Sequence, residues 1–202
     1  MNMKKKMILV FMLLFLVTGC TVVRINTSSI DNIVSVILSK DNKLYNRVGK
    51  GYKYYVPRSV LYIDTNELND KLYSDGNYYY LYIDAVSYFY KNKVDYQERQ
   101  DIYYSKKIKG TKEGYLEIIQ EGSKYHITFV YNYSKIEALV DKNDINEVVL
   151  NASYILSTVK FNDNVIKLML NEEYFTNKEE KYEKFIKKDD TNTKQSVLGE
   201  SE

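Results

Sequence analysis

The sequence is poor in the residues that make cross-links and metal sites. Its 202 residues include one cysteine, one histidine, one proline and no tryptophan. A single cysteine excludes an intramolecular disulfide and a thiolate metal cluster. A single histidine removes most metal sites and most acid–base chemistry near neutral pH. We therefore expect neither a metal nor another cofactor.

The composition is otherwise that of one globular domain. Charged residues make up 28% of the chain, which excludes a protein with many membrane spans. Hydrophobic residues make up 45%, which places the chain far from the intrinsically disordered class.

The first 19 residues have the layout of a secretory signal peptide. Lys4, Lys5 and Lys6 form a positive segment, and an apolar run of eleven residues, 7–17, follows it. As a helix this run would span about 16 Å at 1.5 Å per residue, roughly half the hydrocarbon core of a bilayer. It is therefore too short for a permanent transmembrane helix.

The end of this segment, Val17-Thr18-Gly19-Cys20, resembles the lipobox of bacterial lipoproteins. The resemblance implies removal of a signal peptide at residues 1–19 and diacylglyceryl modification of the Cys20 thiol. Two acyl chains are enough for stable membrane anchoring. The implied location is the extracytoplasmic face of the cell membrane, with the membrane as a partner through lipidated Cys20.

Removal of residues 1–19 changes the charge balance. It takes three lysines from the 29 basic side chains, which leaves 26 basic and 27 acidic side chains and a formal net charge of −1. Because non-specific nucleic-acid binding depends on phosphate neutralisation, we expect no nucleic-acid partner.

The mature chain divides into three parts. We expect a tether at residues 20–28, a single α+β domain at 29–175, and a charged, partly disordered tail at 176–202 that includes a marginal helix at 177–188. Hydrophobic periodicity predicts helices over 29–41, with Ser29 as N-cap, and over 142–159, where Asp144 and Glu147 have capping-box spacing. Residues 165–170 fit either a short helix or an edge strand.

Alternating patterns and turn signals predict the strands. The expected strands cover residues 52–56, 59–64, 78–91, 100–108, 114–121 and 124–133. Pro57 separates the first two, and turn signals stand at 75–77 and 121–123. The predicted fold is α+β, an antiparallel sheet of about five to six strands with an N-terminal helix and a long C-terminal helix packed on it. The order of elements over 29–161 resembles small PsbP-like α/β/α domains, which are mostly non-catalytic accessory or assembly factors.

Tyrosine is the most unusual component, with 22 residues, all after position 20. Alternation along the predicted strand 78–91 places five of them on one face: Tyr78, Tyr80, Tyr82, Tyr88 and Tyr90. Because tyrosine is amphipathic and enriched at interfaces, this face predicts a binding surface for an envelope protein or a cell-wall glycan. The alternative is that tyrosine simply suits strands, in a composition typical of an AT-rich genome.

Motifs for catalysis are absent from the sequence. There is no zinc-protease, nucleophile-elbow or phosphate-loop motif. The segment beginning at Asp141 starts like a calcium loop but lacks its glycine and its final glutamate, so it is interpreted as a helix start. The leading hypothesis is a non-catalytic binding or accessory protein of the cell envelope. The alternatives are an envelope hydrolase that uses His126 as a base and a lipoprotein that captures a small ligand.

Overall fold

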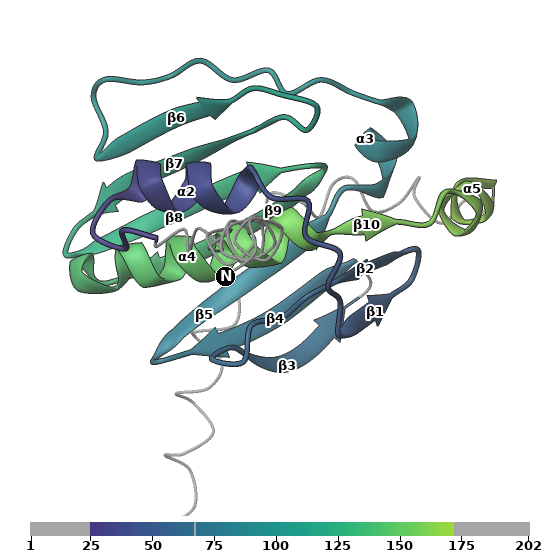
Figure 1. Cartoon of the computed structure of the whole chain (residues 1–202), viewed down its shortest axis with the longest axis horizontal. Coiled ribbons are helices and arrows are strands. Elements are labelled where there is room, and N and C mark those ends of the chain that lie inside the picture. The colour runs from purple at the N-terminus through teal and green to yellow at the C-terminus, as the bar shows by residue number, and fades with distance from the viewer. Residues whose placement is uncertain (1–24, 67, 172–202) are drawn as a thin grey trace, which may run out of the picture.

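An antiparallel sheet of seven strands forms the centre of the fold (Figure 1). The computed structural model describes residues 25–66 and 68–171. The spatial order of the strands is β3-β4-β5-β9-β8-β7-β6. Their bounds are β3 Leu61–Asn66, β4 Asn69–Ser74, β5 Asn77–Ile83, β6 Tyr104–Ile108, β7 Gly114–Glu121, β8 Lys124–Tyr131 and β9 Ser134–Val140. The α+β class is confirmed, but the sheet is larger than predicted.

A second, smaller sheet packs against one end of the first. It consists of β1 (Arg47–Gly49), β2 (Tyr52–Tyr54) and β10 (Lys160–Phe161), with β2 in the middle. Two phenols of β2 reach a buried carboxylate on β4. Tyr54 donates to Asp70 Oδ2 at 2.6 Å and Tyr52 donates to the same oxygen at 3.1 Å. Burial and the charge of Asp70 raise the pKa values of both phenols, so both stay protonated donors.

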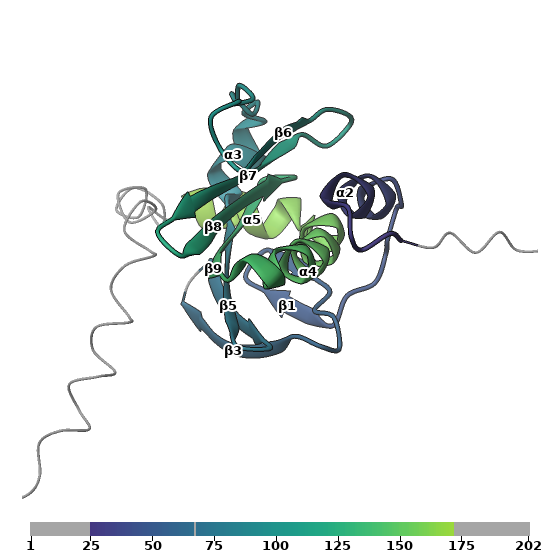
Figure 2. The same cartoon turned by 90° about the vertical axis from the view of Figure 1, so that its left-hand side faces the viewer.

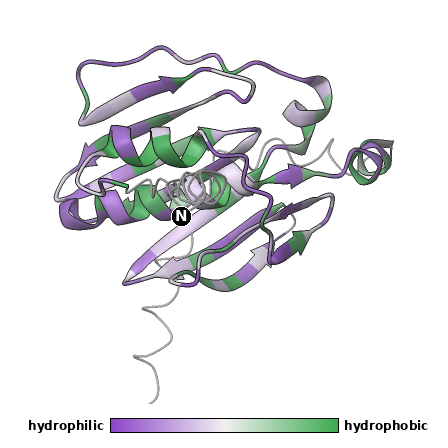
Figure 3. Cartoon of the chain, in the orientation of Figure 1, coloured by the Kyte–Doolittle hydropathy of each residue, from purple (hydrophilic) through white to green (hydrophobic). Residues whose placement is uncertain are grey.

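Two helices cover one face of the large sheet (Figure 2). Helix α4 (Ile145–Thr158) contacts β8 and β9, and α2 (Ile30–Leu38) packs against α4. Ser29 caps α2 as predicted, because its hydroxyl accepts from the backbone N–H of Asn32. Apolar residues concentrate where these helices meet each other and the sheet (Figure 3).

The start of α4 differs from the predicted capping box. A short 3-10 helix, η1 (Lys142–Asp144), precedes it, and Asp144 already has helical backbone angles with no side-chain cap. Its carboxylate instead accepts from the Asn77 side chain at 3.1 Å. A contact with β5 has therefore replaced the local cap.

The predicted strand over 78–91 is wrong beyond Ile83. Asp84 follows, and its carboxylate accepts from the backbone N–H of Ser87 at 2.8 Å, which starts helix α3 (Ala85–Tyr90). The alternating tyrosines continued the strand pattern past this capping residue. Strands β4 and β9 lie in segments where the sequence predicted none.

The turns and the third long helix agree better with expectation. Gly122 has φ +62° in the two-residue turn between β7 and β8, and Gly76 has φ +86° in the turn between β4 and β5. Of the two alternatives for 165–170, the helix is present, as α5 (Asp163–Asn171). Edge strand β3 is irregular, with a register shift between Tyr62 and Asp64. The signal peptide, Cys20 and the tail at 176–202 lie outside the described residues.

Candidate functional site

The face of the sheet opposite α4 carries a cluster of tyrosines. Side chains alternate along each strand, so the residues that flank the buried ones on β4 and β5 share this face. We call it the tyrosine face, and it contains Tyr73, Tyr78, Tyr80 and Tyr82. Among the described residues, no helix of the fold packs over it (Figure 2).

The tyrosines of this face contact one another and a lysine. Tyr73 and Tyr78 are paired across β4 and β5, with ring centroids 5.1 Å apart. The Lys71 ammonium lies 4.6 Å from the ring centroid of Tyr78 and 5.6 Å from that of Tyr80. Tyr78 is 42% exposed, so the cluster is accessible from solvent.

Three of the five tyrosines predicted to share a face therefore do so, and two do not. Tyr88 and Tyr90 lie on α3. The Tyr88 ring stacks on that of Phe161, with ring centroids 3.9 Å apart, and the Tyr88 hydroxyl donates to Asp163. Burial and this carboxylate raise the pKa of Tyr88 to about 12. Tyr88 thus joins α3 to the chain after α4, whereas Tyr90 is 64% exposed.

An ion pair lies next to the tyrosine face on β9. Tyr80 is paired with Glu137 and Tyr82 with Lys135 across the ladder between β5 and β9. Lys135 Nζ lies 2.7 Å from Glu137 Oε1, and the two side chains are 11% and 8% exposed. The second carboxylate oxygen, Glu137 Oε2, is buried without a hydrogen-bond partner among the described residues. A buried carboxylate oxygen without a partner is costly, so a donor that reached it after a shift of the neighbouring side chains would be stabilised.

Sequence reasoning missed this ion pair because it missed β9. The sequence contained only an indirect indication of β9. Strand β8 was predicted, and an antiparallel return after it would bring the next alternating residues beside β5. The turn between β8 and β9 contains no glycine or proline to mark it in the sequence. Its two residues, Asn132 and Tyr133, adopt positive φ angles of +51° and +58°.

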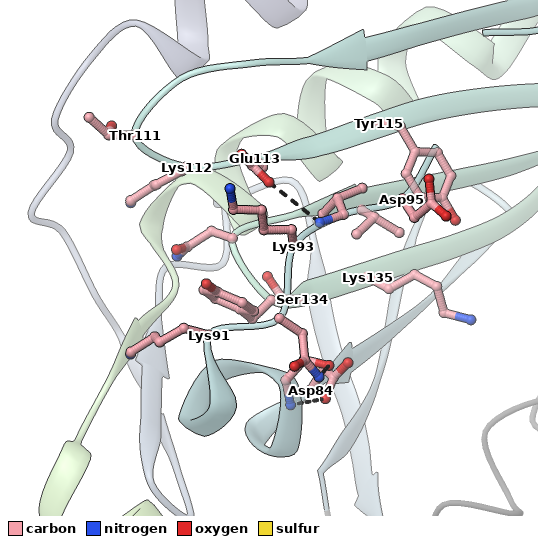
Figure 4. A pocket seen from close by; sticks show the side chains of 16 residues that line it. Asp84, Lys91, Lys93, Asp95, Thr111, Lys112, Glu113, Tyr115, Ser134 and Lys135 are labelled. Atoms are coloured by element: carbon pink, nitrogen blue, oxygen red, sulfur yellow. Dashed lines mark hydrogen bonds between the residues drawn. The ribbon is translucent and has the colours of Figure 1, made fainter. Parts of the chain in front are cut away.

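A pocket of about 380 Å³ continues this surface at the ends of the strands (Figure 4). Lys135 lines it together with Tyr115, the α3 corner and the loop after α3. Its charged residues are Asp84, Lys91, Lys93, Asp95, Lys112, Glu113 and Lys135. Two of the carboxylates already accept backbone N–H groups, Asp84 from Ser87 and Glu113 from Val94.

The loop after α3 covers the far end of the same face. Tyr96 stacks on Tyr115 with centroids 4.0 Å apart and planes 2° apart. Its hydroxyl lies 2.7 Å from Ser105 Oγ and donates to Glu117 at 2.9 Å. This stack fixes the loop against β6 and β7, so the open part of the face lies over β4, β5 and β9.

His126 lies on β8, on the same side of the sheet as Glu137. Its cross-strand neighbours are aliphatic, Ile119 on β7 and Leu139 on β9. Nδ1 is 3.7 Å from a carboxylate oxygen of Glu121, and Nε2 has no hydrogen-bond partner among the described residues. The adjacent strands therefore place no nucleophile opposite this histidine.

Comparison with known proteins found no match for the chain. No family model matches it. No curated protein and no solved structure matches it either. The resemblances to lipoproteins and to PsbP-like domains consequently stay predictions.

The described ranges 25–66 and 68–171 also bear on metal binding and on membrane insertion. They contain no cluster of three or more histidine, cysteine or acidic side chains that could hold a metal ion. They also contain no helix long and apolar enough to cross a bilayer. What the site offers chemically is an aromatic surface beside one buried ammonium and one buried carboxylate.

Proposed function

We propose that this chain is a lipid-anchored, non-catalytic binding protein of the bacterial cell envelope, and that a glycan binds its tyrosine face. The observation that carries the ligand class is the exposed tyrosine cluster on β4 and β5 next to Glu137, the cross-strand partner of Tyr80, whose Oε2 has no hydrogen-bond partner among the described residues. Anchoring rests on the lipobox-like segment that ends at Cys20.

A sugar ring suits both parts of this surface. A pyranose has faces made of C–H groups and a rim of hydroxyls. The electron-rich face of a tyrosine ring attracts C–H groups, and the carboxylate oxygen accepts from a hydroxyl. Lys135 supplies an ammonium donor 2.7 Å from the same carboxylate group. A hydroxyl that reached Glu137 Oε2 after a shift of the neighbouring side chains would remove the cost of the unsatisfied atom.

The arrangement favours binding over hydrolysis. Glu137 is held by a lysine on its own strand, and His126 faces aliphatic residues across both ladders. Capture of a small soluble ligand is a second candidate, supported by the pocket of about 380 Å³, which falls in the size range of small-molecule sites.

The binding test uses the full mature chain, residues 20–202, with Cys20→Ser so that the protein is not lipidated. Protease-treated, soluble cell-wall glycan is titrated into it by calorimetry. Tyr80→Ala and Glu137→Gln are each expected to weaken binding about tenfold, equivalent to about 1.4 kcal/mol. Tyr90→Ala removes an exposed tyrosine outside the face and should leave the affinity unchanged.

The outcomes separate the alternatives. Binding to an envelope protein fraction but not to the glycan would refute the ligand class. Binding of free monosaccharides in the pocket, insensitive to Tyr80→Ala, would favour small-ligand capture. Anchoring is tested separately by the intact mass of the protein from a bacterial host. We expect a chain that starts at a diacylglyceryl-modified Cys20, and a Cys20→Ala variant found processed in the membrane fraction would refute the anchor.

A further inference from the structure

We infer that a groove on the helix side of the domain binds the phosphate headgroup of an anionic phospholipid. The groove lies between α2 and residues 104–112 and has a volume of about 810 Å³. We call it the lysine groove, because Lys106, Lys107, Lys109 and Lys112 line it. The inference rests on the anchoring part of the proposed function. The groove lies under α2 on the helix side of the sheet, and at its far end Lys112 also lines the pocket of about 380 Å³.

The charge in the groove is positive and largely uncompensated. Asp31 is the one carboxylate that lines it in the described part of the chain. Asp31 already accepts from Lys106 Nζ at 2.7 Å and from the Tyr104 hydroxyl at 3.0 Å. Its negative charge is therefore balanced by Lys106. Lys107 donates to the backbone oxygen of Tyr96 at 2.9 Å, which leaves Lys109 and Lys112 as the groove lysines without a carboxylate in the groove.

Lys112 is the most constrained of these lysines. Its ammonium donates to the backbone oxygen of Ser157 at 3.5 Å and forms no ion pair with any described residue. Burial lowers its pKa, and the more distant charge of Asp41 only partly opposes this effect. An anion bound beside Lys112 would stabilise the charged ammonium. Lys109, the neighbouring cation, is exposed at the rim.

The floor of the groove is apolar, which favours an amphiphile over a free phosphate ion. Buried and half-buried side chains from α2, β6 and β8 form it: Val34, Leu38, Tyr104, Ile108 and Tyr131. A phospholipid has an anionic group next to an apolar portion, so its chemistry is complementary to a cationic rim above an apolar floor.

The position of the groove relative to the anchor supports a membrane ligand. Ser29 and Asp31 line one end of the groove, and Ser29 follows Cys20 by nine residues. At no more than about 3.6 Å per residue, the tether reaches about 32 Å. A lipid attached at Cys20 therefore keeps the lysine groove close to the headgroups. Because α2 and the tyrosine face lie on opposite sides of the sheet (Figure 2), a domain seated on this groove would direct the tyrosine face away from the membrane.

The test uses mature chain 20–202 carrying Cys20→Ser, so that no acyl chain contributes. Binding is measured by co-sedimentation with phosphatidylcholine vesicles, with and without phosphatidylglycerol. We expect binding only to vesicles that contain phosphatidylglycerol. A lysine near an anionic surface contributes about 1 kcal/mol, so Lys109→Gln should weaken binding about fivefold and the double variant with Lys112→Gln about 25-fold.

The control is the double variant Lys93→Gln and Lys167→Gln, which has the same net charge but changes exposed lysines outside the groove. Equal binding of the two double variants would overturn the inference, as would equal binding to both kinds of vesicle. The exposed Lys109→Gln alone gives the answer if Lys112→Gln impairs folding. Because the protein in this test carries no lipid, a negative result leaves the mass measurement at Cys20 and the glycan titration unaffected.

Discussion

Removal of the Tyr54 hydroxyl tests how the two sheets are held together. This side chain is 1% exposed and donates the shorter of the two hydrogen bonds to Asp70, at 2.6 Å. Asp70 is 4% exposed, so its carboxylate depends on protein donors rather than on water. In the Tyr54→Phe variant, Asp70 Oδ2 keeps the longer bond from Tyr52, at 3.1 Å, as its side-chain donor among residues 25–66 and 68–171.

The expected cost follows from the charge of the acceptor. A hydrogen bond to a charged group contributes about 1.5–3 kcal/mol, and a neutral one contributes about 1 kcal/mol. We therefore expect Tyr54→Phe to lower the free energy of unfolding by about 2–3 kcal/mol. Tyr79→Phe is the matched control, since Tyr79 is equally buried but its hydroxyl accepts from the neutral amide of Asn151. Its expected cost is about 1 kcal/mol.

Urea unfolding at pH 7 measures the free energy of unfolding of both variants. An m-value equal to that of the wild type would show that unfolding exposes the same amount of surface in each protein. Tyr54→Phe should also cost less when Asp70 is already Asn, because the charge that the phenol stabilises is then gone. A Tyr54→Phe variant no less stable than Tyr79→Phe, or a cost unchanged beside Asp70→Asn, would refute the charged-bond explanation.

Three other changes have expected outcomes that the structure determines. Burial raises the pKa of Tyr79 to about 12, so the unfolded chain, with its pKa near 10, loses this proton first. Stability should therefore fall between pH 10 and pH 12, and Tyr79→Phe should flatten that decline in alkaline urea titrations. Burial, a hydrogen bond to Asp75 and neighbouring negative charge raise the pKa of Glu147. Glu147→Gln should thus stabilise the protein by a few tenths of a kcal/mol at pH 7, with a smaller gain in acid or high salt, as measured by thermal unfolding. A Cβ at Gly114 would lie 2.0 Å from the backbone oxygen of Val130, so Gly114→Ala should cost about 3 kcal/mol, and wild-type stability of this variant would contradict the observed packing of β7 on β8.

Local signals in the sequence account for part of the fold. Strand β7 has the predicted bounds, because alternation runs uninterrupted from Gly114 to the turn at Gly122. Helix α2 begins where predicted, because Ser29 is a strong capping residue. In both places a local rule and the tertiary environment favour the same structure.

The missed elements depend on contacts that a local pattern does not contain. In the sequence, Asp84 fits the alternating pattern of a strand. In the structure, its carboxylate caps helix α3. Strand β9 follows a turn whose second positive-φ residue is Tyr133, a residue type that rarely adopts that conformation.

The candidate site was accordingly predicted only in part. The alternation at Tyr78, Tyr80 and Tyr82 is visible in the sequence, and the structure brings these three residues to one face. Lys135 and Glu137 join them only through the pairing of β5 with β9, which links positions more than 50 residues apart. The lysine groove likewise requires the packing of α2 near β6.

The two edge strands of the large sheet affect whether copies of the domain join edge to edge when they are crowded on one membrane. An exposed edge strand offers unpaired backbone groups to another chain and promotes aggregation. Strand β6 carries Lys106 and Lys107 at one edge, and β3 is irregular between Tyr62 and Asp64 at the other. Charge at one edge and irregular backbone at the other both oppose the joining of sheets between molecules. Crowding in two dimensions should therefore favour separate domains over edge-to-edge polymers.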